Sequence, residues 1–298
     1  MDSSPDSNGR PALPVELHAA TREKHHALNT SIMARLPLCL PPSTNTPLLY
    51  AKGMTVYGQI YFAFEQFLES SLASANQDPR LRDIYQKIYF PSLIRTTRLR
   101  HDLDALKSTL DEHLAQEVDQ LVKDSQAFFS GVTASLSEKP HVLLSYVWAM
   151  YLALFNGGRW IHRQLASAGA EFWGNKTLPL SFWGFEKNDD CGMDGENLKV
   201  QFKTAFMEAS SLLTDAERDE VIEETKKLFD MCSKMVLYLD NTKSTEPLAQ
   251  SSDTEPVLSG LSTSTLSMAT LWGYVASSFA ALRPGYKSAW ERRVAMVD

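Results

Sequence analysis

The feature that most constrains this chain is a helical repeat of apolar residues between about residue 14 and residue 240. Apolar positions recur at three- and four-residue spacing in stretches near 15–36, 50–71, 80–106, 108–134, 140–168, 196–212 and 214–240. This spacing places apolar side chains on one face of an α-helix. No run shows a convincing two-residue alternation of β-branched residues, which would be typical of a strand. The sequence therefore predicts an all-α, multi-helix globular domain.

Helix-breaking residues separate these stretches: Pro41-Pro42, Pro91, Pro140 and the Asp- and Gly-rich segment 188–195. Such residues favour turns between helices. Thr214 is followed three positions later by Glu217, ahead of the apolar residue Val221. This is the pattern of a capping box, in which each of the two side chains accepts a hydrogen bond from the other residue's backbone N–H. The last predicted helix therefore begins at Thr214.

Composition and cysteine content limit the class of protein. The formal net charge is −7, whereas a nucleic-acid-binding surface needs clustered Lys and Arg, so we expect no nucleic acid as a partner. The three cysteines, Cys39, Cys191 and Cys232, are far apart, which suits neither a disulfide framework nor a zinc site. The polar N-terminus lacks the apolar core of a secretory signal. We expect an intracellular protein, in the cytoplasm or at the cytosolic face of a membrane.

Composition also suggests domain boundaries. Residues 1–13 are expected to form a disordered arm, 14–241 the helical domain, and 242–265 a flexible Ser/Thr/Pro linker. The segment 266–282 carries no charge and is followed by a basic tail that ends at residue 298. Its 17 residues are slightly too few for a comfortable bilayer span. Residues 266–298 are thus either a membrane-associated helix with a basic tail or a helix that packs on protein.

The first predicted helix contains adjacent histidines, His25 and His26. Neighbouring residues are about 100° apart on a helix, so these two cannot share a face. His25 falls within the stripe made by Leu17, Thr21, Leu28, Ile32 and Leu36, whereas His26 points nearly opposite. A neutral imidazole in an apolar cleft is a good iron ligand. Residue type and phase alone leave open that His25 is an ordinary hydrogen-bonded core histidine.

The segment 142–165 is strongly apolar and aromatic, and Asn156-Gly157-Gly158 interrupts it. Each interior glycine costs a helix about 1 kcal/mol relative to alanine, so two together suggest a specific use. One use is a kink at which the backbone lies against a flat object such as a tetrapyrrole. Close helix–helix packing is an equally good explanation at this point.

The ordered set of motifs resembles the heme oxygenase family over roughly residues 15–240. Five segments look like family segments in the same order and spacing. They are 20–25 (ATREKH, containing the proximal ligand), 61–65 (YFAFE), 88–103 (IYFP, then Leu99 and Asp102-Leu103), 151–158 (YLALFNGG, the distal segment) and 221–226 (VIEETK). The resemblance implies a helical bundle that clamps haem between the first helix and a kinked distal helix.

The resemblance also implies a reaction. Haem is both substrate and cofactor, with iron held by His25. O2 and electrons from a reductase convert haem to biliverdin, carbon monoxide and iron. The close distal backbone at Gly157 and Gly158 would bend the bound oxygen toward a meso carbon. Asn156 and Tyr61 are further candidate catalytic residues.

The haem propionates need basic partners. By similarity to the family's late basic pair, these are Lys199 and Lys203, one helical turn apart, where the second position is typically Arg in the family. Arg22 could assist, and His18 stands where a first-helix lysine is usual. An ordinary solvated helix face would explain these lysines equally well.

Two distal positions depart from the family pattern. Ala153 stands in place of a glycine, and Leu154 in place of the aspartate that organises a proton-delivering water chain in the family. Leucine can neither accept nor relay a proton. Asn156, Arg159, or Tyr61 through a water could substitute for it. The haem-contacting surface would then include Ala153 and Leu154, but turnover is less well supported than binding.

Three alternatives to an active enzyme stay open. One is a haem-binding protein for sensing, storage or trafficking that does not degrade its ligand. The second is a carboxylate-bridged di-iron protein, which needs Glu, Asp and His on facing helices. The distal segment 142–165 contains no carboxylate, which disfavours that class. The third is a helical interaction module without a cofactor.

Overall fold

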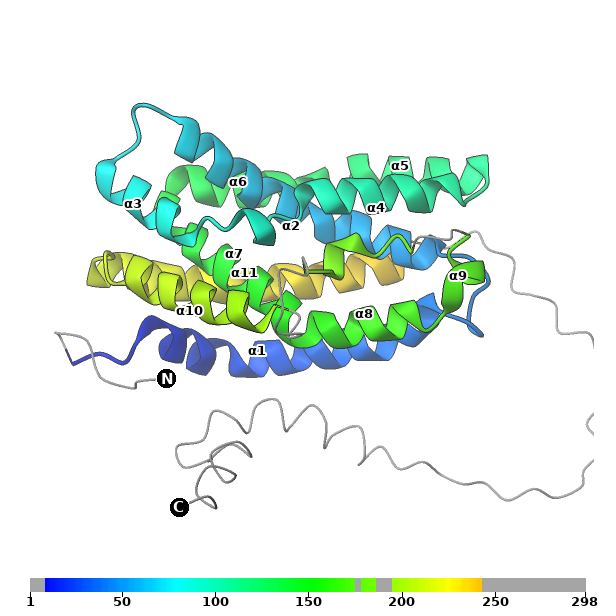
Figure 1. Ribbon diagram of the computed structural model, residues 1–298, viewed down its shortest axis with the longest axis horizontal. Coiled ribbons are helices and arrows are strands. Elements are labelled where there is room, and N and C mark those ends of the chain that lie inside the picture. The colour runs from blue at the N-terminus through cyan, green and yellow to red at the C-terminus, as the bar shows by residue number, and fades with distance from the viewer. Residues whose placement is uncertain (1–8, 175–177, 186–194, 243–298) are drawn as a thin grey trace, which may run out of the picture. The chain divides into compact units, whose positions relative to one another are not determined.

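The computed structural model describes residues 9–174, 178–185 and 195–242, which form the helical unit shown in Figure 1. Residues 243–298, which hold nearly all of the expected linker and the expected C-terminal apolar segment, lie outside the described residues. Most of the expected N-terminal arm does so as well. The domain boundaries suggested by composition therefore stay predictions at both ends of the chain.

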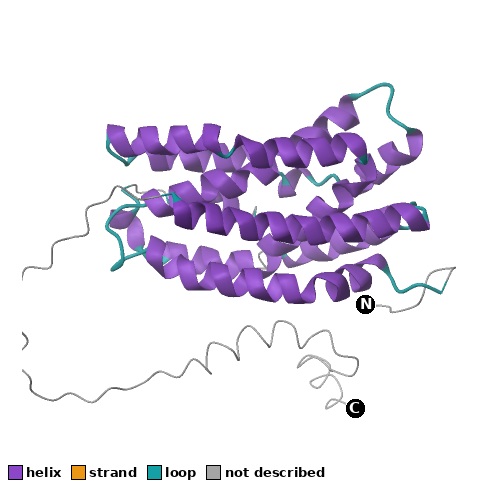
Figure 2. Ribbon diagram, turned by 180° about the vertical axis from the view of Figure 1, so that it is seen from behind, coloured by secondary structure: helices purple, strands orange, loops and turns teal. Residues whose placement is uncertain are grey.

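The described residues are helical and contain no strand, as Figure 2 shows, so the predicted all-α class is confirmed. The α-helices are α1 (Leu13–Arg35), α2 (Leu48–Ala73), α3 (Pro79–Ile88), α4 (Thr96–Ser108), α5 (Glu112–Asp124), α6 (Gln126–Glu138), α7 (Leu143–Ala153), α8 (Arg159–Ala166), α9 (Gly169–Phe172), α10 (Glu196–Ser210) and α11 (Asp215–Asn241). Short 3-10 turns lie at η1 (Leu36–Cys39), η2 (Pro91–Leu93), η3 (Pro140–Val142) and η5 (Ser181–Trp183), and a π-helical turn at η4 (Leu154–Gly158).

Helix α2 is the centre of the bundle. It is apolar on almost every side and is buried along most of its length, as expected for a helix surrounded by others. Helices α4, α5 and α6 pack against it on one side, and α7 and α11 contact it as well (Figure 1). Its buried Lys52 is compensated by Glu117 of α5, with 2.6 Å between Nζ and Oε2. Burial of a charge requires such a partner.

The sequence places most helix ends correctly, with two differences. The stretch 80–106 divides into α3 and α4 around Pro91, and 108–134 divides into α5 and α6 at Ser125. At that break the buried Ser125 hydroxyl donates to the Leu121 carbonyl, a bond that competes with the regular helix. The capping box at the start of α11 is confirmed, because the Thr214 and Glu217 side chains each accept the other's backbone N–H.

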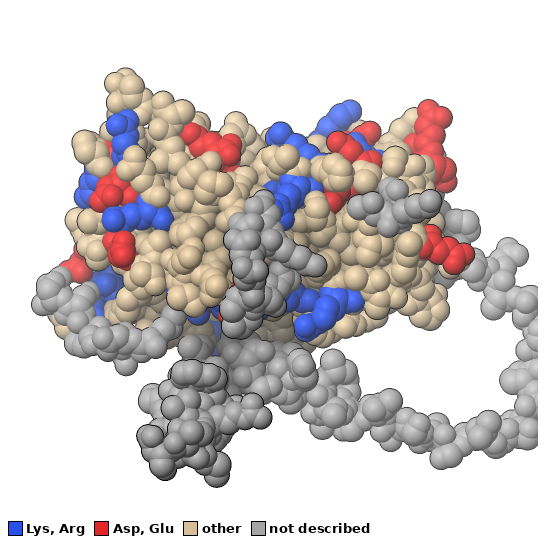
Figure 3. Space-filling view, in the orientation of Figure 1, with Lys and Arg blue, Asp and Glu red and all other residues tan. Residues whose placement is uncertain are grey.

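No helix in the described ranges is long and apolar enough to cross a membrane. On the face shown in Figure 3, Lys and Arg side chains form several small groups mixed with Asp and Glu. This mixture agrees with ion pairs such as Arg80–Glu217 and Lys87–Glu208, which join neighbouring helices.

Candidate functional site

Helix α1 packs against α11 through the predicted apolar stripe. Leu17, Thr21 and Leu28 are buried there, and the Thr21 hydroxyl donates to the Leu17 carbonyl at 2.7 Å. His25 does not share this burial, because its side chain is exposed. It lies about 60° around the helix from Leu28, at the margin of the stripe. His25 therefore lies at the edge of the stripe predicted for it, where its side chain is exposed.

The His25 ring meets α11 with one edge. Its centroid lies 5.8 Å from that of Phe229, with the two rings nearly perpendicular at 76°. The surrounding protein removes part of the water that would stabilise a cation, and His18 and His26 are nearby. Together these effects lower the pKa of His25 below its usual value near 6.5. The imidazole is thus mainly neutral at physiological pH, which is the form that binds iron.

Two more predicted residues, His18 and Arg22, lie on the exposed part of α1. Like His25, both lie off the centre of the apolar stripe. His18 is close enough for its charge to influence the pKa of His25. The structure therefore brings His18 and His25 together on one helix, with Arg22 in the turn between them.

The distal segment is a long helix interrupted by one π-helical turn. Helix α7 passes through η4 into α8, and the two helices run in different directions in Figure 1. Gly158 (φ −58°) and Arg159 (φ −65°) both keep a right-handed helical backbone. A π turn accommodates one extra residue and is frequent at functional sites. The predicted interruption at the double glycine is confirmed. The interruption is a local change from α-helical to π-helical hydrogen bonding. Gly158 keeps a right-handed helical φ there.

The exposed side of this turn carries small residues. Ala153, Asn156 and Gly157 are exposed, whereas Phe155 and Gly158 are buried. A Cβ added to Gly157 would meet nothing within 4 Å. One added to Gly158 would stand 3.2 Å from both a Trp183 ring carbon and the Ala153 carbonyl oxygen. The two glycines therefore have different roles. The missing side chain at Gly158 lets the Trp183 indole pack against the backbone, whereas the missing side chain at Gly157 leaves an exposed helix surface uncovered.

Two predicted site residues face the core. Leu154 is 1% exposed, so its side chain faces the core, and this burial does not support its predicted contact with haem. Tyr61 is also buried, and its hydroxyl donates to the Met150 carbonyl at 3.0 Å. Burial raises the pKa of Tyr61. The hydroxyl proton is thus committed to a backbone acceptor, which does not support a role for Tyr61 as a proton donor.

Arg159, the first residue of α8, retains unused donors. Its Nη1 contacts Glu196 of α10 at 2.5 Å, and its guanidinium lies 5.7 Å from the centre of the Phe185 ring. Its Nε and Nη2 are buried and have no hydrogen-bond partner among the described residues. Buried donors are normally satisfied, so these atoms indicate a place for water or a ligand beside Gly158.

The predicted basic pair lies on α10. Lys199 and Lys203 are half-buried, and neither is in an ion pair with a carboxylate of the described residues. Burial, followed by the positive charge of Lys199, lowers the pKa of Lys203. Two neighbouring ammonium groups that have no ion-pair partner among the described residues form a favourable position for an anion.

Sequence reasoning missed the aromatic segment that supports the distal turn. Leu180–Phe185 contributes Phe182, Trp183 and Phe185, of which Trp183 contacts Gly158 and Phe185 stacks on Phe155. The sequence signal was present as an aromatic run after Pro179. It resembles ordinary core sequence, because only the fold brings it against residues 155–158.

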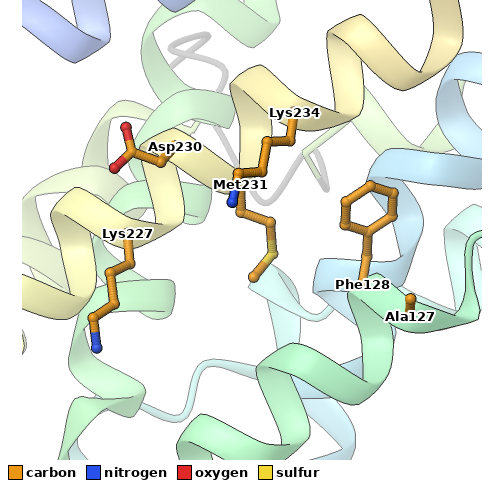
Figure 4. Close-up of a pocket in the computed structure, with 6 residues that line it drawn as sticks. All are labelled: Ala127, Phe128, Lys227, Asp230, Met231 and Lys234. Carbon is orange, nitrogen blue, oxygen red and sulfur yellow. The ribbon is translucent and has the colours of Figure 1, made fainter. Parts of the chain in front are cut away.

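A separate groove of about 440 Å³ lies between α6 and α11. In Figure 4, Met231 extends from α11 into this space opposite Phe128 of α6; Ala127, Lys227, Asp230 and Lys234 complete the lining. No predicted site residue lines it.

Di-iron carboxylate proteins commonly carry a Glu-x-x-His spacing, which occurs here at Glu23–His26 and Glu138–His141. Across the described ranges, however, no three His, Cys, Asp or Glu side chains are grouped to hold a metal ion.

Comparisons with known proteins agree with this arrangement. The heme oxygenase family model matches residues 12–237. The heme-binding protein HMX1 of Saccharomyces cerevisiae is 26% identical over 235 residues, which are 74% of this chain and 72% of that protein. The fold matches heme oxygenase 2 of Chlamydomonas reinhardtii, solved without heme (TM-score 0.61, 18% identity, 76% of this chain and 97% of that one). It also matches heme oxygenase-1 of the cyanobacterium Synechocystis, solved with heme (TM-score 0.57, 20% identity, 77% and 92%). The chain belongs to the heme oxygenase family.

Proposed function

We propose that this protein binds haem through His25 and cleaves it oxidatively to biliverdin, carbon monoxide and iron. The co-substrate is O2, and the electrons come from a reductase. The observation that carries this proposal is the exposed imidazole of His25, packed edge-on against Phe229, on the first helix of a heme oxygenase fold. We propose the distal segment, with the exposed residues Ala153, Asn156 and Gly157, as the opposite wall for the ligand.

Several residues fit this ligand. The missing side chain at Gly157 leaves a bare helix surface that suits a flat macrocycle. Lys199 and Lys203 are cations without a carboxylate partner among the described residues, and they suit the two propionates. Arg22 and His18 are exposed on α1 and would add positive or hydrogen-bonding groups at the mouth of the site. These features match an apolar, planar, dianionic ligand better than a small polar one.

Haem, when bound, supplies the iron that activates O2 next to the ring to be cleaved. The protein's part is to hold and orient. His25 would hold the iron, and Lys199 and Lys203 would hold the propionates by charge-assisted hydrogen bonds. Ala153 and Gly157 allow the distal backbone to approach closely.

Proton delivery must use groups other than a carboxylate at position 154. The unused Nε and Nη2 of Arg159 can hold water by hydrogen bonds, although an arginine does not itself give up a proton at neutral pH. Asn156 is exposed on the same turn and can both donate and accept. We propose Arg159 and Asn156 as the polar groups of the distal side, and we assign Tyr61 a structural role.

One observation favours the second candidate, a haem-binding protein that does not degrade its ligand. The buried Leu154 stands where the family's distal carboxylate is expected, and Tyr61 is hydrogen-bonded to the backbone instead. Without a relay, haem can be held but not cleaved efficiently. The same experiment separates the two functions.

The experiment adds hemin to the full chain, records the Soret band, and then supplies ascorbate or a reductase under air. The His25→Ala variant should lose the Soret band of the bound form, whereas His26→Ala should retain it. A band that decays to a biliverdin spectrum identifies the oxygenase, and a band that persists under reduction identifies the non-degrading binder. Absence of hemin uptake by the unaltered chain would contradict both functions.

A further inference from the structure

The aromatic strap, defined as Leu180–Phe185, supports the distal turn from its buried side. The Trp183 ring lies against Gly158, and a Cβ there would stand only 3.2 Å from the ring. The Phe185 ring is stacked on Phe155, with centroids 4.9 Å apart and planes 7° from parallel. Phe182 stands edge-on to Tyr61 at 5.0 Å. The strap therefore contacts both the π turn itself and the helix that passes beneath it.

Helix α4 holds the strap in place. Asp102 is 2% exposed, and its two carboxylate oxygens accept hydrogen bonds from the Ser181 hydroxyl and the Phe182 backbone N–H, each at 2.7 Å. The Arg98 Nη1 donates to the Gly184 carbonyl at 2.8 Å. Hydrogen bonds to a buried carboxylate are strong, and removal of the acceptor leaves a buried N–H unsatisfied. Asp102 therefore fixes the strap at a single register.

Helix α2 supplies a second attachment. The Trp183 Nε1–H donates to the Tyr50 hydroxyl at 2.8 Å, and Tyr50 is itself buried. This bond sets the position of the indole ring within its own plane, and the indole is the part of the strap that touches Gly158. A displacement of the strap would thus be transmitted to the residue next to Gly157.

We propose that Asp102 is a positioning residue for the distal turn. It acts through Trp183 and Phe185 to fix how far the exposed side of residues 153–157 stands from the ligand. This inference rests on the proposed function for its consequence, because the ligand on the exposed side is haem. The mechanical part, from Asp102 through the strap to the turn, stands on the contacts above and can be tested without haem.

The test compares Asp102→Asn with Asp104→Asn. Asp104 is on the same helix, but its side chain is 75% exposed and pairs with Lys107 at 3.4 Å. Hydrogen exchange of the amides of residues 154–158 is measured in the hemin-free full chain. Asp102→Asn should accelerate this exchange about tenfold or more, since it weakens a charge-assisted hydrogen bond, and Asp104→Asn should not change it. Equal exchange in the two variants would overturn the proposal.

A second readout follows the ligand side. In the hemin-loaded, reduced, CO-bound protein, the C–O stretching frequency reports contacts on the distal side of the ring. Asp102→Asn should shift or broaden this band, and Trp183→Phe, which keeps an aromatic ring but loses the bond to Tyr50, should do the same. Leu136→Ala removes a buried side chain of α6 and lowers stability, but should leave the band unchanged. A shift of equal size in Leu136→Ala would mean that Asp102 serves general stability only.

The two readouts separate failure of the inference from failure of the proposed function. If the unaltered chain takes up no hemin, the function fails, and the exchange experiment still decides the role of Asp102. If Asp102→Asn does not fold, Trp183→Phe and Ser181→Ala carry the same comparison against Asp104→Asn. Normal hemin binding with unchanged exchange and an unchanged band in these variants would contradict the inference alone.

Discussion

The two walls of the candidate site are held in place by different chemistry. Helix α1, which carries His25, is one regular helix joined to α11 by a leucine stripe and a series of ion pairs at the surface. Examples are Lys24 with Asp230 and Arg35 with Asp240. The distal turn is held by buried aromatic rings and by hydrogen bonds to one buried carboxylate. The α1 wall is thus a regular helix held partly by exposed ion pairs, whereas the distal wall is an irregular turn held by buried contacts.

This difference indicates where precision is needed. A histidine ligand needs one position on one helix, which a regular helix supplies. A backbone that must approach a flat ligand closely needs control of its register and its distance, and shape-complementary packing gives that control better than exposed ion pairs do. Substitutions on the distal wall should therefore have larger effects than substitutions on the α1–α11 surface.

The largest expected effect comes from restoring the family's carboxylate. Leu154→Asp should lower the free energy of unfolding by about 3 kcal/mol or more, because the side chain is buried and has no polar partner prepared for it. Thermal unfolding of the hemin-free chain measures this, with the volume-conserving Leu154→Met as control. If Leu154→Asp melts at the same temperature as the unaltered chain, position 154 does not face the core.

A smaller effect, opposite in sign at two adjacent positions, should distinguish the two sides of the turn. Gly158→Ala should destabilise the fold by about 1–3 kcal/mol through its contacts with Trp183 and the Ala153 carbonyl. Gly157→Ala should be neutral or should stabilise the helix by up to about 1 kcal/mol. It should also weaken hemin binding, because the new methyl group occupies the bare surface. Thermal unfolding and hemin titration of both variants test this, and equal stability losses would contradict the distinction.

The sequence predicts the helices of the α1 wall, but not the buried contacts that hold the distal turn. Helical periodicity and the capping box at Thr214 locate α1, α2 and α11 well, because those signals are local. The ordered motifs select His25, although they do not show that it is exposed. The burial of Leu154 was not anticipated because this residue was assigned from its alignment with the family's distal aspartate, and not from its own apolar character. The strap was missed because the contacts of Asp102 and Trp183 join residues about 80 and 130 positions apart.

The smallest expected effect lies on the α1–α11 surface. Arg35→Gln should cost about 0.2–1 kcal/mol at low ionic strength and less in 1 M salt, because the Arg35–Asp240 pair is exposed and screened. The hydrogen bond from Arg35 holds the pKa of Asp240 below its usual value. The stabilisation is therefore present above the ordinary aspartate range and lost as pH falls through the lowered pKa. Denaturant titration at several pH values and salt concentrations checks this, with Lys123→Gln, an exposed residue of α5, as control.

The π turn also has a consequence for how one continuous helix serves two environments. Upstream, α7 is buried on nearly all sides, whereas in α8 only Leu165 is buried. The additional residue changes the rotational phase between these halves by about 100°. Helix α7 can therefore keep the apolar pattern of a buried helix, and α8 can keep that of a helix buried on one side only. Deleting one residue of the turn would rejoin the halves in a single phase and rotate Arg159 away from Glu196, even though no contact residue had been replaced.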